Sequence, residues 1–351
     1  MIASTVRRSS VSSLEVRLRA GLERNGITGE AAETIVRSIT SFALYGFPES
    51  HAASFALLAY ASAYLKAHYP AAFYTALLNH QPMGFYHPST LVKDAQRHGV
   101  EIRPIDVSVS YWDCVVEERS VRLGLRYVRG MREETGRRIE AERRRRAFES
   151  LQDFVLRVRP NRKEVATLAQ VGALGGFGSA RREALWQVEK AVRYAGPLLD
   201  SLPDEEDVSP LREMGVIEKL LADYEGMGVT TGPHPMALHR ARLRAQGMPA
   251  ARDLGKLPEG KRVRVAGWVI VRQRPATAKG FLFLSLEDET GIINVVIRPP
   301  LFDRYRMLLM TAPFLMVEGT LQNREKVVSV LAHRLTEFPA VLPAAVSHDF
   351  H

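Results

Sequence analysis

The longest weakly charged apolar segment of the chain runs from Gly46 to Asn79. Ser50 has the side chain of a helix N-cap, and the Ala- and Leu-rich run after it continues to His68, so the pattern predicts a helix of about 28 Å. Pro70 suits the first turn of a second helix over 71–78. The apolar run is too short and carries too many polar side chains for a membrane span. We therefore predict a buried helix with a few polar groups on one face.

Two shorter helical patterns precede this segment. Leucines recur at helical spacing over 14–22, and alanine and isoleucine do so over 31–39, on either side of Gly26. They predict two amphipathic helices that pack on the central segment. Residues 1–12 are polar, and we expect them to be disordered.

Residues 88–124 have the pattern of a small α/β connector. A helix is predicted over 90–98, and a strand over 100–103 is ended by Pro104. Apolar pairs at 115–116 and 121–123 flank a polar turn and predict a hairpin. We expect Trp112 to lie in the core.

The next segment, 124–132, joins a glycine-bounded turn to a helix that runs to Arg146, and it resembles a helix-hairpin-helix unit. In such a unit a Gly-apolar-Gly hairpin directs backbone N–H groups at DNA phosphates. Arg132 occupies the second glycine position, where a left-handed backbone would carry a cost. A second helical pair over 161–188 contains Gly172-Ala173-Leu174, a corresponding element that could be structural only.

Positive charge is concentrated on this hairpin and its helix. Between Arg119 and Arg146 the sequence has eleven arginines against four glutamates. A solvated helix face is the alternative interpretation, but beside a phosphate-binding hairpin the run predicts sequence-independent, salt-sensitive contacts with a duplex. The predicted DNA-binding residues here are Arg126, Arg129, Gly130, Arg132, Arg137, Arg138, Arg143 and Arg144.

Residues 196–213 are acidic and contain prolines, which is typical of a linker. Their acidic run, 204–207, could suggest metal ligands, but a solvated linker is the simpler interpretation because no strand pattern adjoins it. Residues 211–245 are again helical in pattern, with a break at 230–236. His234 and His239 have no third ligand nearby in the sequence, so we interpret the His-Pro segment as a structural turn.

The last region has the alternation of strands. Strands are predicted over 262–271, 281–286 and 292–297, then a helix over 299–309, then strands over 314–321 and 327–331. This order is that of an OB-fold, a small barrel that often binds single strands through stacking rings and cations. The candidate DNA-binding residues are Trp268, Arg272, Arg274, Lys279, Phe281 and Phe283. Phe281 and Phe283 share one face by alternation and could equally fill the barrel.

The amino-acid composition limits the kinds of partner that this protein could bind. With 48 Lys and Arg against 39 Asp and Glu, the net charge is +9, which favours a polyanionic partner such as nucleic acid. The single cysteine, Cys114, excludes an internal disulfide and a cysteine-based zinc cluster. Residues 1–20 contain no apolar core of a secretory signal, so we expect a cytoplasmic protein without a membrane partner.

Several phrases of the sequence resemble one known family. They are ESHAASFAL at 49–57 with Tyr60, LKAHYP at 65–70, YGFPESH at 45–51 and QPMGFY at 81–86. The first two are similar to the fingers of bacterial polymerase III alpha subunits, the family C DNA polymerases. The last two resemble the error-prone, damage-response branch of that family, which implies translesion synthesis and repair.

The resemblance covers nearly the whole chain and only the C-terminal part of the family's polypeptide. It implies an α+β multidomain protein, mainly helical fingers and a helix-hairpin-helix region followed by a small all-β OB-fold barrel. The implied limits are partial fingers at 1–87, connector at 88–124, helix-hairpin-helix region at 125–195, linker and helices at 196–255, OB-fold at 256–340 and tail at 341–351. The fingers would place five polar residues near an incoming nucleotide: Ser50, His51, Ser54, Tyr60 and Lys66. The alternative interpretation is structural, with a helix cap, a histidine that is hydrogen-bonded within the protein, and a lysine that extends from a buried helix to solvent.

A polymerase holds two Mg²⁺ ions on paired aspartates of its palm, and we find no Asp-x-Asp on any predicted strand. The resemblance puts the palm upstream of the matched region. We therefore expect Mg²⁺ only on that missing palm, no cofactor in this chain, and no DNA-directed DNA polymerase activity from the chain alone. A palm-bearing polypeptide and other damage-response subunits would be its protein partners, and primer-template duplex and single-stranded template its DNA partners. The alternatives are a standalone DNA-binding protein and an anticodon-binding appendage of a synthetase, the latter leaving 46–79 unexplained.

Overall fold

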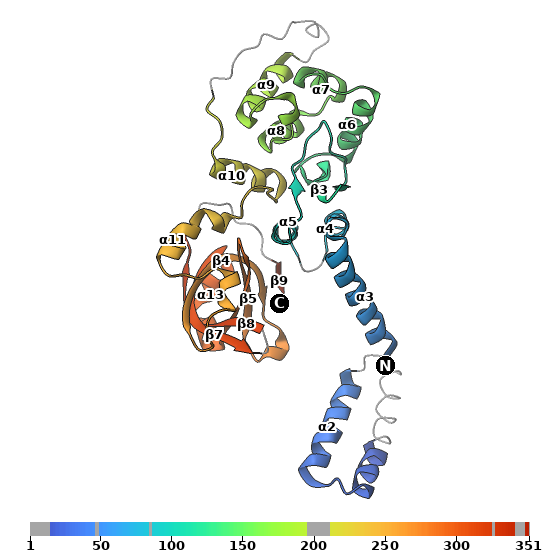
Figure 1. The fold of residues 1–351 in the computed structure, drawn as a ribbon, viewed down its shortest axis with the longest axis vertical. Helices are drawn as coiled ribbons and strands as arrows, with labels where there is room; N and C mark the ends of the chain where they lie inside the picture. Colours follow the sequence, from blue (N-terminus) through green and yellow to red (C-terminus); the bar gives the residue numbers. More distant parts are fainter. Residues whose placement is uncertain are drawn as a thin grey trace. The chain divides into compact units, whose positions relative to one another are not determined.

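The computed structural model describes residues 15–45, 49–83, 86–194, 211–324, 327–340 and 348–350. The chain divides into two compact units, Met1–His68 and Tyr69–His351. Figure 1 shows their elements along the sequence. Within the described residues, no helix combines the length and the apolar character needed to cross a membrane.

The first unit is helical. A helix over 15–24 and α2 (Gly29–Tyr45) confirm the two helices predicted before the central segment. An ion pair between Arg19 and Glu33, 2.6 Å long, joins them. The helix predicted from Ser50 is α3 (Glu49–His68). Residues 1–12, predicted to be disordered, lie outside the described part.

The prediction that α3 is buried is wrong. Leu57, Leu58 and Tyr60 have exposed fractions of 69%, 60% and 71%, and every described residue from 52 to 65 is exposed. The reason is the pattern itself: apolar side chains lie on all sides of α3, so one neighbouring surface could not cover them.

The second unit begins with a helical part built on a small sheet. The hairpin predicted in the connector is confirmed as β2 and β3, and β1 pairs in parallel with β3. The elements of this part are α4 (Pro70–Asn79), α5 (Pro88–Arg97), β1 (Ile102–Arg103), β2 (Val115–Glu117), β3 (Ser120–Arg122) and the 3-10 turn η1 (Leu125–Tyr127). Trp112 packs against the core of this part, as predicted.

Four helices then surround one core, with Ile139, Phe154, Leu168 and Val188 fully buried in it. They are α6 (Glu133–Arg145), α7 (Leu151–Val158), α8 (Arg162–Gln170) and α9 (Arg181–Tyr194), with the 3-10 turn η2 (Gly175–Phe177) between the last two. After the region 195–210, which lies outside the described residues, come α10 (Val216–Met227), η3 (Pro235–His239), α11 (Arg240–Ala245) and α12 (Ala251–Leu254).

Gly124 lies between β3 and η1, just before the helix-hairpin-helix region, and its surroundings leave no room for a side chain. A Cβ there would lie 2.3 Å from the Trp112 carbonyl oxygen and 2.7 Å from the Cys114 nitrogen, which are backbone atoms that cannot rotate away. We expect Gly124→Ala to lower the free energy of unfolding by about 1–3 kcal/mol, measured by urea denaturation. Gly175→Ala is the control, because a Cβ at 175 meets nothing within 4 Å. Equal stability of the two variants would contradict this account of Gly124.

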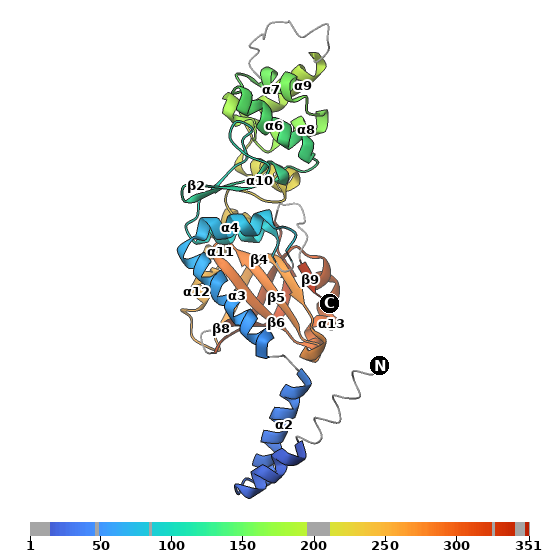
Figure 2. The same ribbon diagram turned by 90° about the vertical axis from the view of Figure 1, so that its right-hand side faces the viewer.

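The barrel confirms the predicted order of three strands, a helix and two strands (Figures 1 and 2). Neighbouring strands follow the order β5-β6-β8-β7-β4, and pairing of β4 with β5 closes the ring, with the short β9 beside β4. The elements are β4 (Arg262–Gln273), η4 (Ala276–Ala278), β5 (Leu282–Asp288), β6 (Gly291–Ile297), α13 (Pro299–Thr311), β7 (Phe314–Arg324), β8 (Val327–Glu337) and β9 (His348–Phe350). Alternate apolar side chains, such as Leu282, Leu284 and Leu286 on β5, fill the interior.

The helical part and the barrel of this unit share buried polar contacts. Lys93 of α5 donates to the Gly232 carbonyl at 2.6 Å, and Arg97 donates to the Glu287 carboxylate of β5 at 2.8 Å. Burial lowers the pKa of Lys93 to about 8, although nearby Glu287 and Asp223 act in the opposite direction. His234 caps η3 by accepting the Met236 N–H at 3.1 Å, which confirms the structural turn predicted there.

Candidate nucleic-acid interface

The first hairpin lies between η1 and α6. Gly130 has φ of +77°, so glycine takes the left-handed position of the turn. Arg132 is the extended N-cap residue of α6, with φ of −80°. The strain predicted for a left-handed backbone at Arg132 is therefore absent, because the left-handed residue of this turn is Gly130, two positions earlier.

The start of α6 is already occupied by a carboxylate of this chain. Glu164, the third residue of α8, is fully buried and accepts the Arg132 N–H at 3.1 Å and the Arg132 Nε at 3.0 Å. It also accepts the Asn161 N–H at 2.9 Å, which completes a capping box on α8. Burial alone would raise the pKa of Glu164, but the hydrogen bonds from Arg132 and Asn161 outweigh it and lower the pKa to about 2. The Arg132 N–H, which the hairpin interpretation directs at a phosphate, thus donates to Glu164 instead.

Most arginines of the basic run also have partners within the chain. Arg126 donates to the Asn79 carbonyl and pairs with Asp113, both at 2.9 Å. Arg143 donates to the Val107 and Ser110 carbonyls at 2.8 Å, and its burial lowers its pKa. Further ion pairs join Arg137 to Asp113, Glu133 and Glu140, Arg138 to Glu134, Arg144 to Glu140, Arg122 to Glu117, Arg145 to Glu142, and Arg146 to Glu149 and Asp153. The run is therefore largely a network of ion pairs, with part of each outer guanidinium still accessible.

Arg129 and Gly130 differ from this pattern. Both are exposed at the tip of the hairpin, and Lys163 of α8 lies beside Gly130, where a Cβ would be 3.6 Å from its side chain. Within the described residues, no acidic side chain pairs with Arg129. The hairpin therefore presents two cations at its tip, Arg129 and Lys163, the second of which the sequence analysis did not select.

A second hairpin joins α8 to α9. Gly172 and Gly178 have positive φ, of +81° and +79°. The residues Gly176-Phe177-Gly178, which end two residues before α9 begins, form the Gly-apolar-Gly pattern that the first hairpin lacks, and the sequence analysis missed this signal. The arginines at the start of α9 are engaged: Arg181 pairs with Asp223 at 2.7 Å, and Arg182 contacts Glu218.

The residues predicted to face a nucleotide lie on α3. Side chains of Ser50 and His51 lie outside the described part, Ser54 and Tyr60 are exposed, and Lys66 is partly exposed. At about 100° per residue, Ser54, Tyr60 and Lys66 are separated around the helix by about 120° from one another. The helix therefore does not bring these three side chains to one face.

Two of the residues predicted to bind DNA on the barrel are buried. Trp268 is 3% exposed, stacked on Phe314 with ring centroids 5.3 Å apart and edge-on to Tyr224 at 5.2 Å. Arg272 is 6% exposed and donates to the Leu309 and Ala312 carbonyls at the end of α13. Neither side chain offers a surface to a base or a phosphate in this structure, because each completes the packing between strands and helices.

The outer face of β5 and β6 is open. Phe283 is 39% exposed and pairs across the strands with Val296, while the exposed Asn294 lies opposite Ser285. Phe281, partly exposed, precedes the strand in a turn. Asn294 was missed, although a polar residue between two apolar ones in a strand indicates an outward side chain.

Cations lie on the loop that enters β5. Arg274 and Lys279 are exposed, and the Arg274 guanidinium lies 4.3 Å from the centre of the Phe302 ring. A stacking ring, an amide and two cations beside one strand pair are the groups with which OB-folds bind single strands.

Two family models match these two parts of the chain. A helix-hairpin-helix motif model matches residues 99–184, and a model of an OB-fold nucleic acid binding domain matches residues 263–338. Together the two matches support a nucleic-acid-binding protein that carries both modules in one polypeptide.

Relatives that match along the whole chain indicate a more specific class of protein than the two family models do. The error-prone DNA polymerase of Alkalilimnicola ehrlichii is 45% identical over 358 residues, covering 100% of this chain and 35% of the relative. Those of Pseudomonas savastanoi and Anaeromyxobacter sp. are 45% and 43% identical, over 93% and 99% of this chain and 32% of each relative. The chain is homologous to error-prone DNA polymerases along its whole length and spans about one third of theirs, and its modules are consistent with their C-terminal portion. The predicted resemblance is confirmed.

Among solved structures, the asparaginyl-tRNA synthetase from Pyrococcus horikoshii matches with 24% identity and a TM-score of 0.23, over 27% of this chain and 23% of that one. A likeness this low says nothing about function.

Proposed function

We propose that this chain is the DNA-gripping part of an error-prone, damage-response DNA-directed DNA polymerase. The helix-hairpin-helix region would contact the duplex, and the β5–β6 face of the barrel would contact single-stranded template. The observation that carries the proposal is the match of the whole chain to polymerases three times its length, with both nucleic-acid modules inside the matched part. Translesion synthesis and repair are the roles that such a polymerase would serve.

The catalytic metal site would lie outside this chain. Among the described residues, no group of three or more His, Cys, Asp or Glu side chains is placed to hold a metal, and the acidic run at 204–207 lies outside them. In this proposal the two Mg²⁺ ions belong to a palm in the two thirds of the relatives that this chain does not span. The exposed apolar surface of α3 would pack against that part, because a helix that is apolar on all sides needs cover on all sides.

The test is primer extension with the chain alone and with a polypeptide that carries the rest of a homologous polymerase. We expect extension only from the mixture. Extension by the chain alone would refute the placement of the metal site. Duplex binding without any stimulation of the mixture would favour a standalone DNA-binding protein.

Phe283 gives a sharper test of the barrel face. We expect Phe283→Leu to weaken binding of a single-stranded oligonucleotide by about 1–3 kcal/mol, because leucine keeps the apolar contact with Val296 but removes the ring on which a base would stack. Fluorescence anisotropy measures the change. Trp186→Leu removes an exposed ring, 42% accessible on α9, as the control. Equal affinity of Phe283→Leu and the wild type for the oligonucleotide would show that the Phe283 ring does not contact the single strand.

A further inference from the structure

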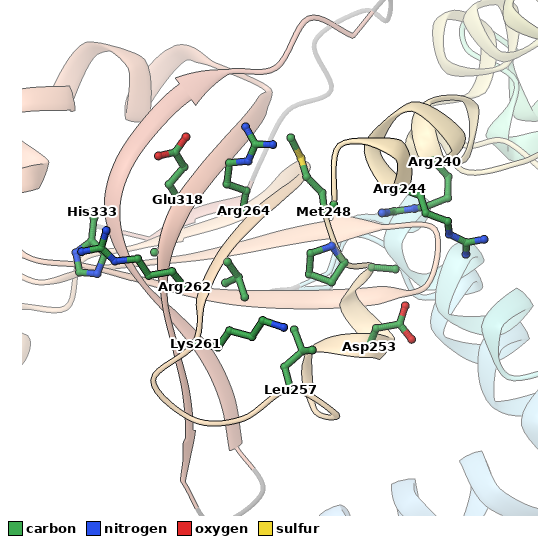
Figure 3. A pocket seen from close by; sticks show the side chains of 15 residues that line it. Arg240, Arg244, Met248, Asp253, Leu257, Lys261, Arg262, Arg264, Glu318 and His333 are labelled. Carbon is green, nitrogen blue, oxygen red and sulfur yellow. The ribbon is translucent and has the colours of Figure 1, made fainter.

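A groove of about 570 Å³ lies on the barrel away from the β5–β6 face. Its walls come from α11, the segment between α11 and β4, and the outer sides of β4, β7 and β8 (Figure 3). Most of the strand wall belongs to β4 and β7, whereas Phe283 lies on β5 and faces the β5–β6 surface. The groove is therefore a surface of the barrel separate from the β5–β6 face.

The side chains around the groove are mainly cationic. Arg244, Lys261 and Arg262 are exposed, and within the described residues none of the three forms an ion pair. Arg264 is also exposed and donates to the Gln246 carbonyl at 3.0 Å. Arg240 is different, because Asp288 and Glu289 already neutralise it.

Acidic groups do not balance these cations. Asp253 and Glu318 are the carboxylates of the lining, and Asp253 pairs with Lys256 at 3.3 Å. His333, which also lines the groove, contacts Thr320 at 2.7 Å. An exposed concave surface with a surplus of unpaired cations attracts an anion.

The floor of the groove is apolar. Met248 and Ala250 are 3% and 4% exposed, and Pro249 and Leu257 are partly exposed beside them. Figure 3 shows Met248 and Leu257 between the arginines of α11 and the cations at the start of β4. Pro249 and Leu257 are the accessible part of this floor, and an apolar surface between cations suits a planar ring that carries a phosphate. The volume lies within the range of about 300–1,000 Å³ typical of small-molecule sites.

We infer that this groove binds one nucleotide unit of single-stranded nucleic acid, with its phosphate on Lys261, Arg262 and Arg264 and its base on the partly exposed Pro249 and Leu257. This inference rests on the proposed function, since it takes the anion to be part of a nucleic acid. It adds to the barrel a contact outside the β5–β6 face, so that a strand can engage two sides of one domain.

The experiment measures binding of a fluorescein-labelled oligo-dT to the full chain by anisotropy over a range of salt concentrations. The groove variant is Lys261→Glu with Arg262→Glu. Its control is Arg304→Glu with Arg306→Glu, which makes the same change of charge at exposed positions of α13. We expect the groove variant to bind at least about 10-fold more weakly than the control and to show a salt dependence shallower by about 0.7 in log–log slope, as loss of one neutralised phosphate requires.

The outcomes separate the two levels of the proposal. If the wild-type chain binds no oligonucleotide, the proposed function fails and the groove loses its ligand with it. If the wild type binds and the groove variant matches the control, the groove inference is overturned while the proposed function stands. Unlabelled dTMP, inorganic phosphate and a poly-glutamate peptide serve as competitors: oligo-dT should compete far better than all three, and stronger competition by the peptide would overturn the assignment.

Discussion

Replacing Asp288 by alanine is expected to lower the free energy of unfolding of the second unit by about 3–5 kcal/mol. Asp288 is fully buried at the end of β5, where the chain turns into β6. One carboxylate oxygen accepts the Thr290 N–H and hydroxyl at 2.7 Å and the Gly291 N–H at 3.0 Å. The other accepts the Ala251 N–H at 2.8 Å and the Arg240 guanidinium at 2.9 Å.

The size of the effect follows from what alanine leaves behind. The substitution removes acceptors from three backbone N–H groups of the β5–β6 turn and the start of α12, and Arg240 keeps only Glu289 as its partner. Buried donors without acceptors cost more than the hydrogen bonds themselves contributed. Because the donors come from the turn, α12 and α11, the loss should loosen the attachment of both helices to the barrel.

Urea denaturation followed by tryptophan fluorescence measures this change, since Trp268 lies in the core between the barrel and α10. The control is Asp303→Ala, an exposed aspartate on α13, which should change the free energy of unfolding by less than about 0.5 kcal/mol. Asp288→Asn should lie between the two, since the amide keeps one acceptor oxygen. A variant Asp288→Ala as stable as the wild type would show that water replaces the carboxylate at this turn.

The contrast between the barrel and this turn shows what the sequence could predict. Alternation of apolar and polar residues gave all five barrel strands and α13 correctly, because each signal lies within a few consecutive residues. The sequence analysis gave Glu287, Asp288 and Glu289 no role beyond joining two predicted strands. Its roles depend on Arg97, Arg240 and the Ala251 N–H, which are between 37 and 190 residues away along the chain. Local patterns carry no information about such partners.

The same limit applies to the candidate interface. Eleven arginines in a short segment predicted a cationic surface, but whether the charge of each is neutralised depends on the carboxylates that folding brings to it. Arg143 turns inward to backbone carbonyls, and Arg132 meets a glutamate 32 residues away. Trp268 and Arg272 failed as surface candidates for a related reason: on a barrel strand, burial on the outer side depends on which helices cover it, and α10 and α13 cover these two.

For α3 the sequence was informative about the helix and misleading about its burial. The Ala- and Leu-rich run after Ser50 predicted the helix that the structure shows as Glu49–His68. Burial needs a neighbouring surface as well, and an apolar sequence does not show where that surface is encoded. The relatives are about three times as long as this chain, so a surface that covers α3 could belong to the part of them that this chain does not span. The proposed packing of α3 against the remainder of a polymerase follows from that comparison rather than from the helix itself.

The two hairpins differ in a way that matters for DNA. In the first, Glu164 holds the N–H of Arg132 and so takes the position that a phosphate would need at the start of α6. In the second, Gly176-Phe177-Gly178 has the usual residue pattern, with Arg181 and Arg182 engaged at the start of α9. The carboxylate therefore gives the first hairpin a structural role, and its removal tests that role directly.

We expect Glu164→Ala to lower the free energy of unfolding by about 2–4 kcal/mol, because it leaves the N–H groups of Arg132 and Asn161 without their acceptor at the starts of α6 and α8. Glu134→Ala is the matched control, since that side chain is 76% exposed and its nearest arginine contact is 3.8 Å long. Urea denaturation of both variants measures the difference, and equal stabilities would show that the hairpin does not depend on the buried carboxylate.

The ionisation of Glu164 adds a dependence on pH with a definite sign. Its pKa in the folded chain is about 2, below the ordinary value of 4.5, so the folded state binds fewer protons than the unfolded state between these two values. The stability that Glu164 contributes is therefore complete above pH 4.5 and is lost as the pH falls toward 2. Glu164→Gln cannot lose a charge, so its free energy of unfolding should fall less steeply than that of the wild type between about pH 5 and pH 3. Parallel curves for the two proteins over this range would mean that Glu164 has a nearly ordinary pKa and that the ion pair with Arg132 does not hold the hairpin.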